Sequence, residues 1–271
     1  MVTVQTYIPV NLSQLVKSFW CLKVSDFKEK LYKENIIPDG HHEIIFHLSA
    51  GNAKRSNSST GWVSEPDAFF AGQTLNSYSL ELKNNSQLYG IRFYPHTLSL
   101  LFGFPANDIT NTILALHEIP EAGFLKNCIS ENQEETFKNF ETVLLELSRK
   151  IDTSTNRFHY IGYSVKEILR NKGNIGIDYL IKKTGVSQRY FDTLFKQSVG
   201  INPKQFCSII RLNHFINYRK TNPSKKLTEC CYEAGFFDQS HLIKLFRSAT
   251  GQSPKEYFRN VNQINDYFLK L

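Results

Sequence analysis

Two stretches near the end of the chain repeat one pattern of residues. Residues 187–204 and 238–255 align at an offset of 51. Gln188, Leu194, Phe195, Gly200, Pro203 and Lys204 recur as Gln239, Leu245, Phe246, Gly251, Pro254 and Lys255. In each copy the apolar residues are spaced for one face of a helix, so the remaining side chains point outward. The outward side chains are Gln188, Arg189, Asp192, Thr193 and Lys196 in the first copy, and Gln239, Ser240, Ile243, Lys244 and Arg247 in the second.

These outward side chains suit contacts with nucleic acid. Gln and Arg can form paired hydrogen bonds with base edges in the DNA major groove, and Ile can contact a thymine methyl group. Lys and Arg near a helix end can contact phosphates. We predict base contacts from Gln188, Arg189, Asp192, Thr193, Gln239, Ser240, Ile243 and Lys244, and phosphate contacts from Lys196, Lys204, Arg247 and Lys255.

Each copy also carries the signals of a helix-turn-helix. Gly185 and Gly235 supply the permissive backbone that a tight turn between two helices needs. Ser187 and Asp238 can accept the free N–H groups at the start of the second helix. Phe191, Leu194 and Phe195, or Leu242, Leu245 and Phe246, form its buried face. Gly200 and Gly251 end it, and Pro203 and Pro254 follow as stop signals.

The net charge of +7 is unevenly divided along the 271 residues. Residues 1–155 hold 13 Lys and Arg against 17 Asp and Glu, a net charge of −4. Residues 156–271 hold 19 against 8, a net charge of +11. A length of ~100–200 residues per domain predicts about two domains. The basic part is the one suited to a polyanion, and it contains both copies of the repeat.

The repeat region closely resembles the DNA-binding domain of AraC/XylS-type transcription regulators. The resemblance covers about residues 158–260 and is carried by Glu233-Ala234-Gly235-Phe236-Phe237-Asp238-Gln239-Ser240-His241-Leu242, Leu245-Phe246-Arg247, Gly251-Gln252-Ser253-Pro254 and Tyr257. Arg211-Leu212 fits the start of that family's connecting helix. The resemblance implies two recognition helices that enter successive major-groove segments. It carries base contacts over to Arg189, Asp192, Thr193, Gln239, Ser240, Ile243 and Lys244.

The first half of the chain is predicted to be rich in β-strands. Ile44, Phe46 and Leu48, and later Ile91 and Phe93, alternate with other residues at the period of half-buried strands. Residues 12–19 fit a short helix, and the Ser- and Asn-rich residues 54–61 fit a mobile surface loop. Turn signals such as Pro38-Asp39-Gly40 separate the strands.

About residues 7–119 look like an N-terminal domain of unassigned function found in some AraC-type regulators, which implies a sensory or oligomerisation role. The residues of the resemblance include Phe19-Trp20, Ile37-Pro38-Asp39-Gly40, Ala71-Gly72-Gln73 and Gly90-Ile91-Arg92-Phe93-Tyr94-Pro95.

An amphipathic helix is expected to close this half of the chain. Phe137, Phe140, Leu144, Leu147 and Ile151 follow a three-four spacing. This stripe fits a dimer seam and a helix packed on its own domain equally well. Residues 152–156 then fit a linker. We predict an α+β chain of two domains: residues 1–155 as a β-rich, barrel-like domain with flanking helices, and residues 156–271 as an all-α DNA-binding domain with two helix-turn-helix motifs joined by a linker helix.

A candidate effector pocket in the β-rich domain is formed by Arg92, Glu43, Trp62 and Phe93. Arg92 interrupts an apolar strand, so it should meet an anionic ligand or, in preference, an internal carboxylate such as Glu43 or Asp39. Aromatic side chains in strands fill a core more often than they line a pocket. His41 and His42 are adjacent and point to opposite faces of a strand, so we predict no metal site and no cofactor.

Composition and motifs exclude several classes of protein. No apolar run reaches the ~18–20 residues of a membrane span, and residues 1–5 lack the pattern of a secretion signal, so we expect a cytoplasmic protein. Two cysteines in the first half cannot form a four-cysteine zinc site of the kind found in DNA-repair alkyltransferases, and no nucleotide-binding or hydrolase motif is present.

We therefore predict a sequence-specific transcription regulator, not an enzyme. The partners would be double-stranded DNA, a small-molecule effector, a second copy of the chain and, for an activator, RNA polymerase. The alternative is an architectural DNA-binding protein with weak sequence preference.

Overall fold

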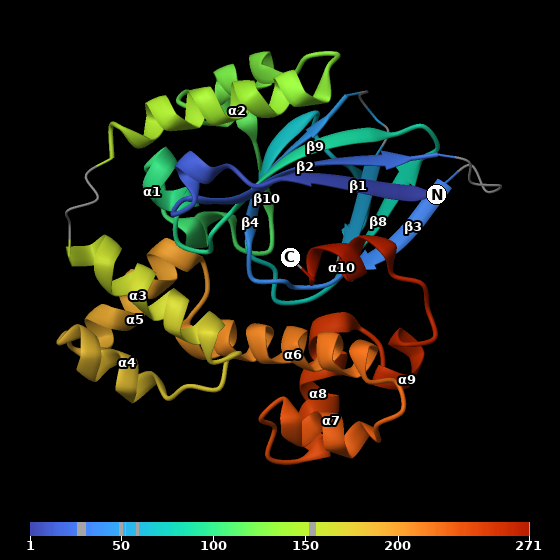
Figure 1. Cartoon of the computed structure of the whole chain (residues 1–271), viewed down its shortest axis with the longest axis vertical. Helices are drawn as coiled ribbons and strands as arrows, with labels where there is room; N and C mark the ends of the chain where they lie inside the picture. The colour runs from blue at the N-terminus through green and yellow to red at the C-terminus, as the bar shows by residue number, and fades with distance from the viewer. Residues whose placement is uncertain (26–30, 49–50, 52, 58–59, 152–155, 271) are drawn as a thin grey trace.

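The computed structural model describes residues 1–25, 31–48, 51, 53–57, 60–151 and 156–270. Residues 1–151 form an N-terminal unit of two antiparallel sheets, and residues 156–270 form a C-terminal unit of helices (Figure 1). We use these two names below. The expected α+β architecture is confirmed. Within the described part of the chain, none of the helices has the length and apolar character that a membrane crossing requires.

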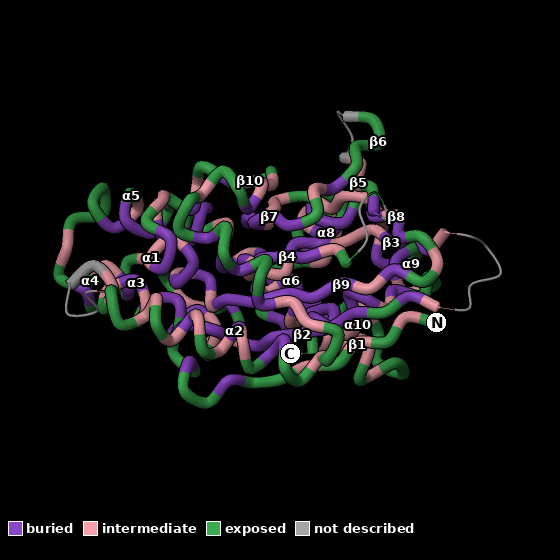
Figure 2. Tube along the Cα trace, turned by 90° about the horizontal axis from the view of Figure 1, so that it is seen from above, coloured by how far each residue is buried: buried purple, intermediate pink, exposed green. Residues whose placement is uncertain are grey.

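The larger sheet of the N-terminal unit has six strands. Their order is β1 (Val2–Tyr7), β2 (Val16–Val24), β9 (Gln87–Phe93), β4 (His42–His47), β7 (Ala68–Ala71) and β10 (Ile113–Ala115). The smaller sheet has the order β3 (Leu31–Ile36), β8 (Tyr78–Lys83), β5 (Ala53–Asn57) and β6 (Thr60–Ser64). Figure 2 shows the buried residues gathered along the strands of the larger sheet, with the β5–β6 hairpin projecting from the body of the molecule.

Both faces of the larger sheet are covered. On β2, Phe19 packs on one side and Trp20 on the other, and on β4 Ile44 and Ile45 divide in the same way. One face packs against α2 (Gln133–Ser148) and α1 (Leu98–Phe102), and the opposite face packs against the smaller sheet. The prediction of half-buried strands is therefore wrong for β4 and β9. Even Arg92 on β9 is only 1% exposed.

Short 3-10 helices connect the strands and helices of this unit. They are η1 (Val10–Leu12), η2 (Ala106–Ile109), η3 (Leu116–Glu118) and η4 (Gly123–Cys128).

The apolar stripe of α2 packs on its own sheet: Phe140 and Leu144 are fully buried, and the ring of Phe140 lies 5.6 Å from that of Phe19. These buried side chains show the second of the two expected arrangements, a helix packed on its own domain.

The C-terminal unit consists of eight helices in the described residues. They are α3 (Asn156–Arg170), α4 (Ile177–Thr184), α5 (Gln188–Val199), α6 (Pro203–Thr221), α7 (Leu227–Glu233), α8 (Gln239–Thr250), α9 (Pro254–Tyr257) and α10 (Gln263–Phe268). The long helix α6 joins a cluster of α3, α4 and α5 to a cluster of α7, α8 and α9 (Figure 1). Each cluster has its own apolar core, and α6 contributes to both.

Four local expectations differ from the structure. Residues 16–19 belong to strand β2, so the short helix expected over 12–19 is limited to η1. Residues 54–57 and 60–61 belong to β5 and β6, because their backbone pairs with β8 and with each other. The connecting helix α6 begins at Pro203 and not at Arg211. Of the expected linker, residues 152–155 lie outside the described residues, and Asn156 begins α3.

Candidate functional site

The first half of the repeat forms a helix-turn-helix from α4 and α5. Gly185 ends α4 with a φ of +71°, a conformation that favours glycine. The Ser187 hydroxyl accepts a hydrogen bond of 3.3 Å from the backbone N–H of Tyr190, which caps the start of α5. Phe191 and Phe195 are fully buried. The turn, the cap and the buried face predicted for this copy are thus confirmed.

The second half of the repeat follows the same plan in α7 and α8. Gly235 has a φ of +78°, and the Asp238 carboxylate accepts a 2.7 Å hydrogen bond from the backbone N–H of His241. Leu242 and Phe246 are fully buried, whereas Leu245 is only half-buried. As predicted, Gly200 and Gly251 end α5 and α8 in the left-handed conformation. Pro203 and Pro254 also have a second role, because they occupy the first turns of α6 and α9, where a missing N–H costs nothing.

The outward side chains of both copies are accessible. Gln188, Arg189, Thr193, Lys196, Lys204, Ser240, Lys244, Arg247 and Lys255 are exposed, and Asp192, Gln239 and Ile243 are half-buried. The Gln239 amide oxygen accepts a 3.3 Å hydrogen bond from the hydroxyl of Thr228 on α7, so the two helices of this copy are linked beside a proposed base-contacting residue. Nothing in the repeat pattern indicates this role of Thr228.

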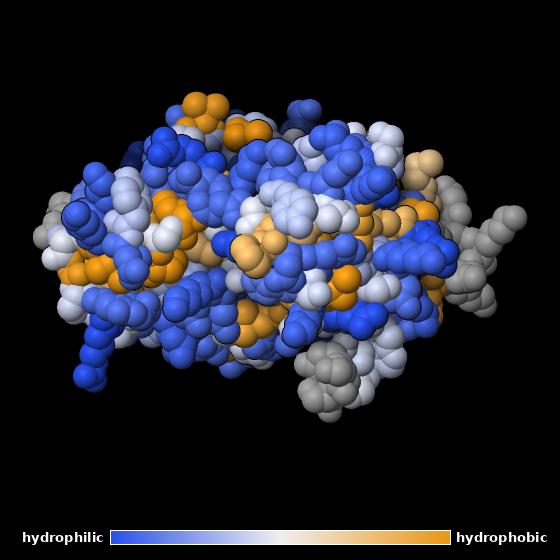
Figure 3. Space-filling view, turned by 90° about the horizontal axis from the view of Figure 1, so that it is seen from below, coloured by the Kyte–Doolittle hydropathy of each residue, from blue (hydrophilic) through white to orange (hydrophobic). Residues whose placement is uncertain are grey.

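A groove of about 960 Å³ runs between α5 and α8. Its lining includes four proposed DNA contacts on α5, namely Gln188, Asp192, Thr193 and Lys196, together with Lys204 on α6. Ser208 of α6 and the loop residues Leu75 and Asn76 of the N-terminal unit also line it, and sequence reasoning missed all three. Figure 3 looks at the side of the molecule where α4, α7 and α8 lie and shows a mainly hydrophilic face with scattered apolar spots.

One exposed aromatic residue was also missed as a candidate. Phe237 lies in the turn of the second helix-turn-helix and is 90% exposed, the highest exposure of any large apolar side chain in the described residues. It directly precedes Asp238, the cap of α8. Its ring therefore stands in water beside the recognition helix α8.

The N-terminal unit contacts the ends of both recognition helices. The Thr110 hydroxyl donates a 2.7 Å hydrogen bond to the carbonyl of Gly200 at the end of α5, and the Ser99 hydroxyl donates one of 3.3 Å to the carbonyl of Ser198. The backbone N–H of Ser77 donates a 2.8 Å hydrogen bond to the carbonyl of Ala249 in α8. The last carbonyls of a helix lack hydrogen-bond partners within the helix, so these donors supply the missing hydrogen bonds. The N-terminal unit therefore holds α5 and α8 at fixed positions.

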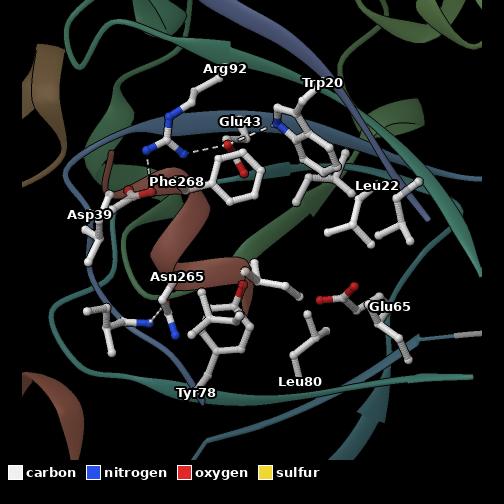
Figure 4. A pocket seen from close by; sticks show the side chains of 17 residues that line it. Trp20, Leu22, Asp39, Glu43, Glu65, Tyr78, Leu80, Arg92, Asn265 and Phe268 are labelled. Atoms are coloured by element: carbon white, nitrogen blue, oxygen red, sulfur yellow. Dashed lines mark hydrogen bonds and ion pairs between the residues drawn. The ribbon is translucent and has the colours of Figure 1, made fainter. Parts of the chain in front are cut away.

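An ion-paired arginine lies inside the N-terminal unit (Figure 4). Arg92 donates to the carboxylate of Glu43 at 2.8 Å and to that of Asp39 at 2.6 Å. Glu43 also accepts a 3.2 Å hydrogen bond from the Trp20 indole N–H. Burial raises the pKa of Glu43, and the charge of Arg92 opposes that rise. Burial and the charge of Arg92 together lower the pKa of nearby Lys17 to about 8.

The residues proposed for an effector pocket are not all neighbours. Arg92 and Glu43 line one cavity between the two sheets, and Arg92 meets internal carboxylates, as the sequence favoured. Phe93 points to the opposite face of the larger sheet, because successive strand residues alternate, and packs 6.1 Å from Phe102. Trp62 on β6 is 45% exposed and lies beside Lys33. Among the described residues, no three His, Cys, Asp or Glu side chains converge on a common metal position.

The two capped helix-turn-helix motifs, carried on one basic unit and presenting polar side chains outward, define a DNA-binding protein. Comparison with known families agrees with this class. The model of a "Helix-turn-helix domain" matches residues 180–260, and the model of a "Domain of unknown function (DUF6597)" matches residues 5–115. The chain thus carries an AraC-type helix-turn-helix domain in its C-terminal unit and a DUF6597 domain in its N-terminal unit.

Individual relatives are distant. The Msm operon regulatory protein of Streptococcus mutans is 22% identical over 117 residues, which is 42% of this chain and 41% of that protein. The chain therefore spans less than half of this curated relative. ToxT from Vibrio cholerae is 14% identical, with 95% of this chain and 98% of that chain covered at a TM-score of 0.47. The AraC-like transcriptional activator CuxR is 13% identical, with 86% and 90% covered at a TM-score of 0.26.

Proposed function

We propose that this protein is a sequence-specific DNA-binding transcription regulator whose two recognition helices, α5 and α8, enter successive major-groove segments on one face of the duplex. The observation that carries this proposal is the duplicated arrangement itself. Each recognition helix has a capped start, a buried apolar face and an accessible polar face, and α6 joins the two copies. Two such helices on one face of B-DNA contact sites about one turn, ~34 Å, apart.

The proposed contacts divide into two kinds. Base contacts come from Gln188, Arg189, Asp192, Thr193, Gln239, Ser240, Ile243 and Lys244, and phosphate contacts come from Lys196, Lys204, Arg247 and Lys255. The exposure of nine of these twelve side chains and the partial exposure of the other three support the assignment. Phosphate contacts supply affinity for any sequence, whereas base contacts supply discrimination.

We further propose that the N-terminal unit controls the C-terminal unit. It contacts the ends of α5 and α8 through Thr110, Ser99 and Ser77, so a change in the N-terminal unit reaches both recognition helices. The cavity beside Arg92 is the proposed location of a small-molecule effector. We place the boundary between the regulatory domain and the DNA-binding domain at residues 155–156.

A salt-dependent competition experiment separates this function from that of an architectural protein. A binding site is first selected from random DNA with the full chain, and its affinity is then compared with that of random duplex across a salt series. Both kinds of protein lose affinity as salt rises, because both release counterions. A regulator should prefer its selected site by a factor of ~10³ or more. Equal affinity for the selected site and random DNA at every salt concentration would show an architectural protein.

A further inference from the structure

The last described helix of the C-terminal unit packs against the two sheets of the N-terminal unit. Helix α10 follows the region matched by the helix-turn-helix family model, which ends at residue 260. Its Phe268 is 8% exposed, and its ring lies 5.3 Å from the ring of Trp20. The guanidinium carbon of Arg92 lies 5.0 Å from the centre of the Phe268 ring (Figure 4). Phe268 thus contacts side chains of both β2 and β9 in the larger sheet.

A buried carboxylate anchors the start of α10. Glu34 on β3 accepts hydrogen bonds from the backbone N–H groups of Ile264 and Asn265 at 2.9 and 2.8 Å, and from the Asn265 side chain at 2.7 Å. The Asn265 side-chain oxygen in turn accepts a 3.0 Å hydrogen bond from the backbone N–H of Ile37. A helix of six residues is too short to be stable in water by itself. Its order therefore depends on this docking.

Phe268 occupies part of the space between the two sheets. The cavity that remains beside it measures about 70 Å³, whereas ligand pockets usually measure ~300–1,000 Å³. Its walls are largely apolar, with Leu22, Ile45 and Leu80 among them. A ring-sized molecule can enter this space only where Phe268 has left it.

The charges around the cavity indicate which molecules suit it. The positive charge of Arg92 is already balanced by Asp39 and Glu43, so an anion entering the cavity gains no free cation there. Glu65, another wall residue, is held by Arg55 at 2.6 Å and by His47 at 2.9 Å. Apolar walls with internally balanced charges favour an uncharged aromatic molecule.

The docked helix also bears on the DNA-facing groove. The five residues 258–262 connect α10 to α9, which follows the second helix-turn-helix. While the N-terminal unit is docked, its residues Leu75 and Asn76 form part of the wall of the groove that also contains Gln188 and Thr193. A duplex that contacts those side chains would approach the same wall. Release of the N-terminal unit therefore clears the approach to α5.

We propose that α10 is an internal ligand of the N-terminal unit: an uncharged aromatic effector competes with Phe268 for the space between the sheets, displaces α10 and thereby increases affinity for DNA. The proposal rests on the proposed function, because it takes DNA binding as the output. Coupling between the two sites is reciprocal, so tighter DNA binding and easier release of α10 accompany each other.

Toluene, with benzoate as its anionic counterpart, serves as the probe for the full chain. Amide hydrogen exchange of residues 263–270 reports whether α10 is docked. In the wild-type chain, toluene should speed exchange in this segment and benzoate should leave it unchanged. Exchange that stays constant or slows with toluene overturns the proposal, because a ligand that fits beside a docked Phe268 would protect the helix.

Two variants and a control test the link to DNA. Phe268→Ala should show fast exchange in α10 without toluene and should bind the selected site about fivefold or more tightly than the wild-type chain. Asn265→Ala weakens the docking from its other end and should change both readouts in the same directions, which covers the case in which Phe268→Ala fails to fold. Val261→Ala changes a 77% exposed side chain just before α10 and should match the wild type.

The outcomes separate the two proposals. If neither the wild type nor the variants prefer the selected site to random DNA, the proposed function fails. If all of them prefer it, but Phe268→Ala and Asn265→Ala bind it with wild-type affinity, only the role of α10 is overturned.

Discussion

Replacing Arg92 with methionine should destabilise the N-terminal unit strongly. The Arg92 side chain is 1% exposed and bridges two carboxylates at 2.6 and 2.8 Å, one on Asp39 and one on Glu43. Methionine keeps most of the apolar stem but removes the charge. Glu43, with 16% of its side chain exposed, is then left in an apolar surrounding without its cation. The change therefore tests whether this ion pair holds β4, β9 and the segment around Asp39 together beside α10.

The expected loss follows from the burial of the pair. Removing one partner of a buried ion pair costs about 3–5 kcal/mol, because the other charge stays buried and uncompensated. At about 2–4 °C per kcal/mol for a chain of this size, the midpoint of thermal unfolding should fall by about 6–20 °C. Urea unfolding followed by Trp20 fluorescence measures the loss in the N-terminal unit. A Trp62→Phe background leaves Trp20 as the sole tryptophan of the two in the chain.

The loss should also depend on pH. Burial already raises the pKa of Glu43, and loss of Arg92 removes the main opposing effect, so this pKa should rise further. A carboxyl group whose folded pKa exceeds its unfolded value of ~4.3 contributes stability below that value, and this contribution is lost as pH rises through the folded pKa. The deficit of Arg92→Met relative to the wild type should thus be smallest near pH 4 and should grow toward pH 7.

A second substitution provides the control. Adding Glu43→Gln removes the stranded charge and should recover about 2 kcal/mol at pH 7 while flattening the pH dependence. A deficit below about 1 kcal/mol that does not change between pH 4 and pH 7 would refute the assignment of Arg92 as a buried, paired charge. So would a double variant no more stable than Arg92→Met.

Three further changes test the recognition helices and the domain boundary. Gln239→Ala or Arg189→Ala should cost about 1–3 kcal/mol of binding free energy at one base pair and relax the preference for that base pair. Competition with single-base variants of the selected site measures this effect, and unchanged discrimination would exclude a base contact. Gly235→Ala should lower the free energy of unfolding in urea by about 1–2 kcal/mol, because alanine is strained in the left-handed conformation of this residue. The loss should be larger still, because the added methyl group would lie 2.1 Å from the Asn174 side chain. Gly123→Ala, which meets nothing within 4 Å, should be nearly neutral. The fragment 156–271 should retain specific DNA binding in a mobility-shift assay, and a fragment unable to bind would contradict the boundary at 155–156.

Local signals explain what the sequence predicted well. The caps Ser187 and Asp238 and the turn glycines Gly185 and Gly235 act on backbone groups within a few residues of themselves. Their physical role can therefore be recognised without knowledge of the rest of the chain. The repeat strengthened the prediction, because two copies of the same signals are far less common by chance than one.

Long-range contacts explain what the sequence missed. Glu34 binds the start of α10 across 230 residues, and nothing near either position indicates the other. Arg92 and Phe93 do not share the expected pocket, because neighbouring strand residues point to opposite faces, and both faces of this sheet are covered. The alternation alone does not show which face meets α2 and which meets the smaller sheet. Residues 54–57 form a strand only because β6 and β8 lie beside them.

The central claim is that α5 and α8 contact two successive major-groove segments of one duplex. Hydroxyl-radical footprinting of the selected site with the full chain tests it most directly. Two protected patches on the same face, ~10 base pairs apart, are the predicted result. A single protected patch, or even protection along the whole duplex, would contradict it.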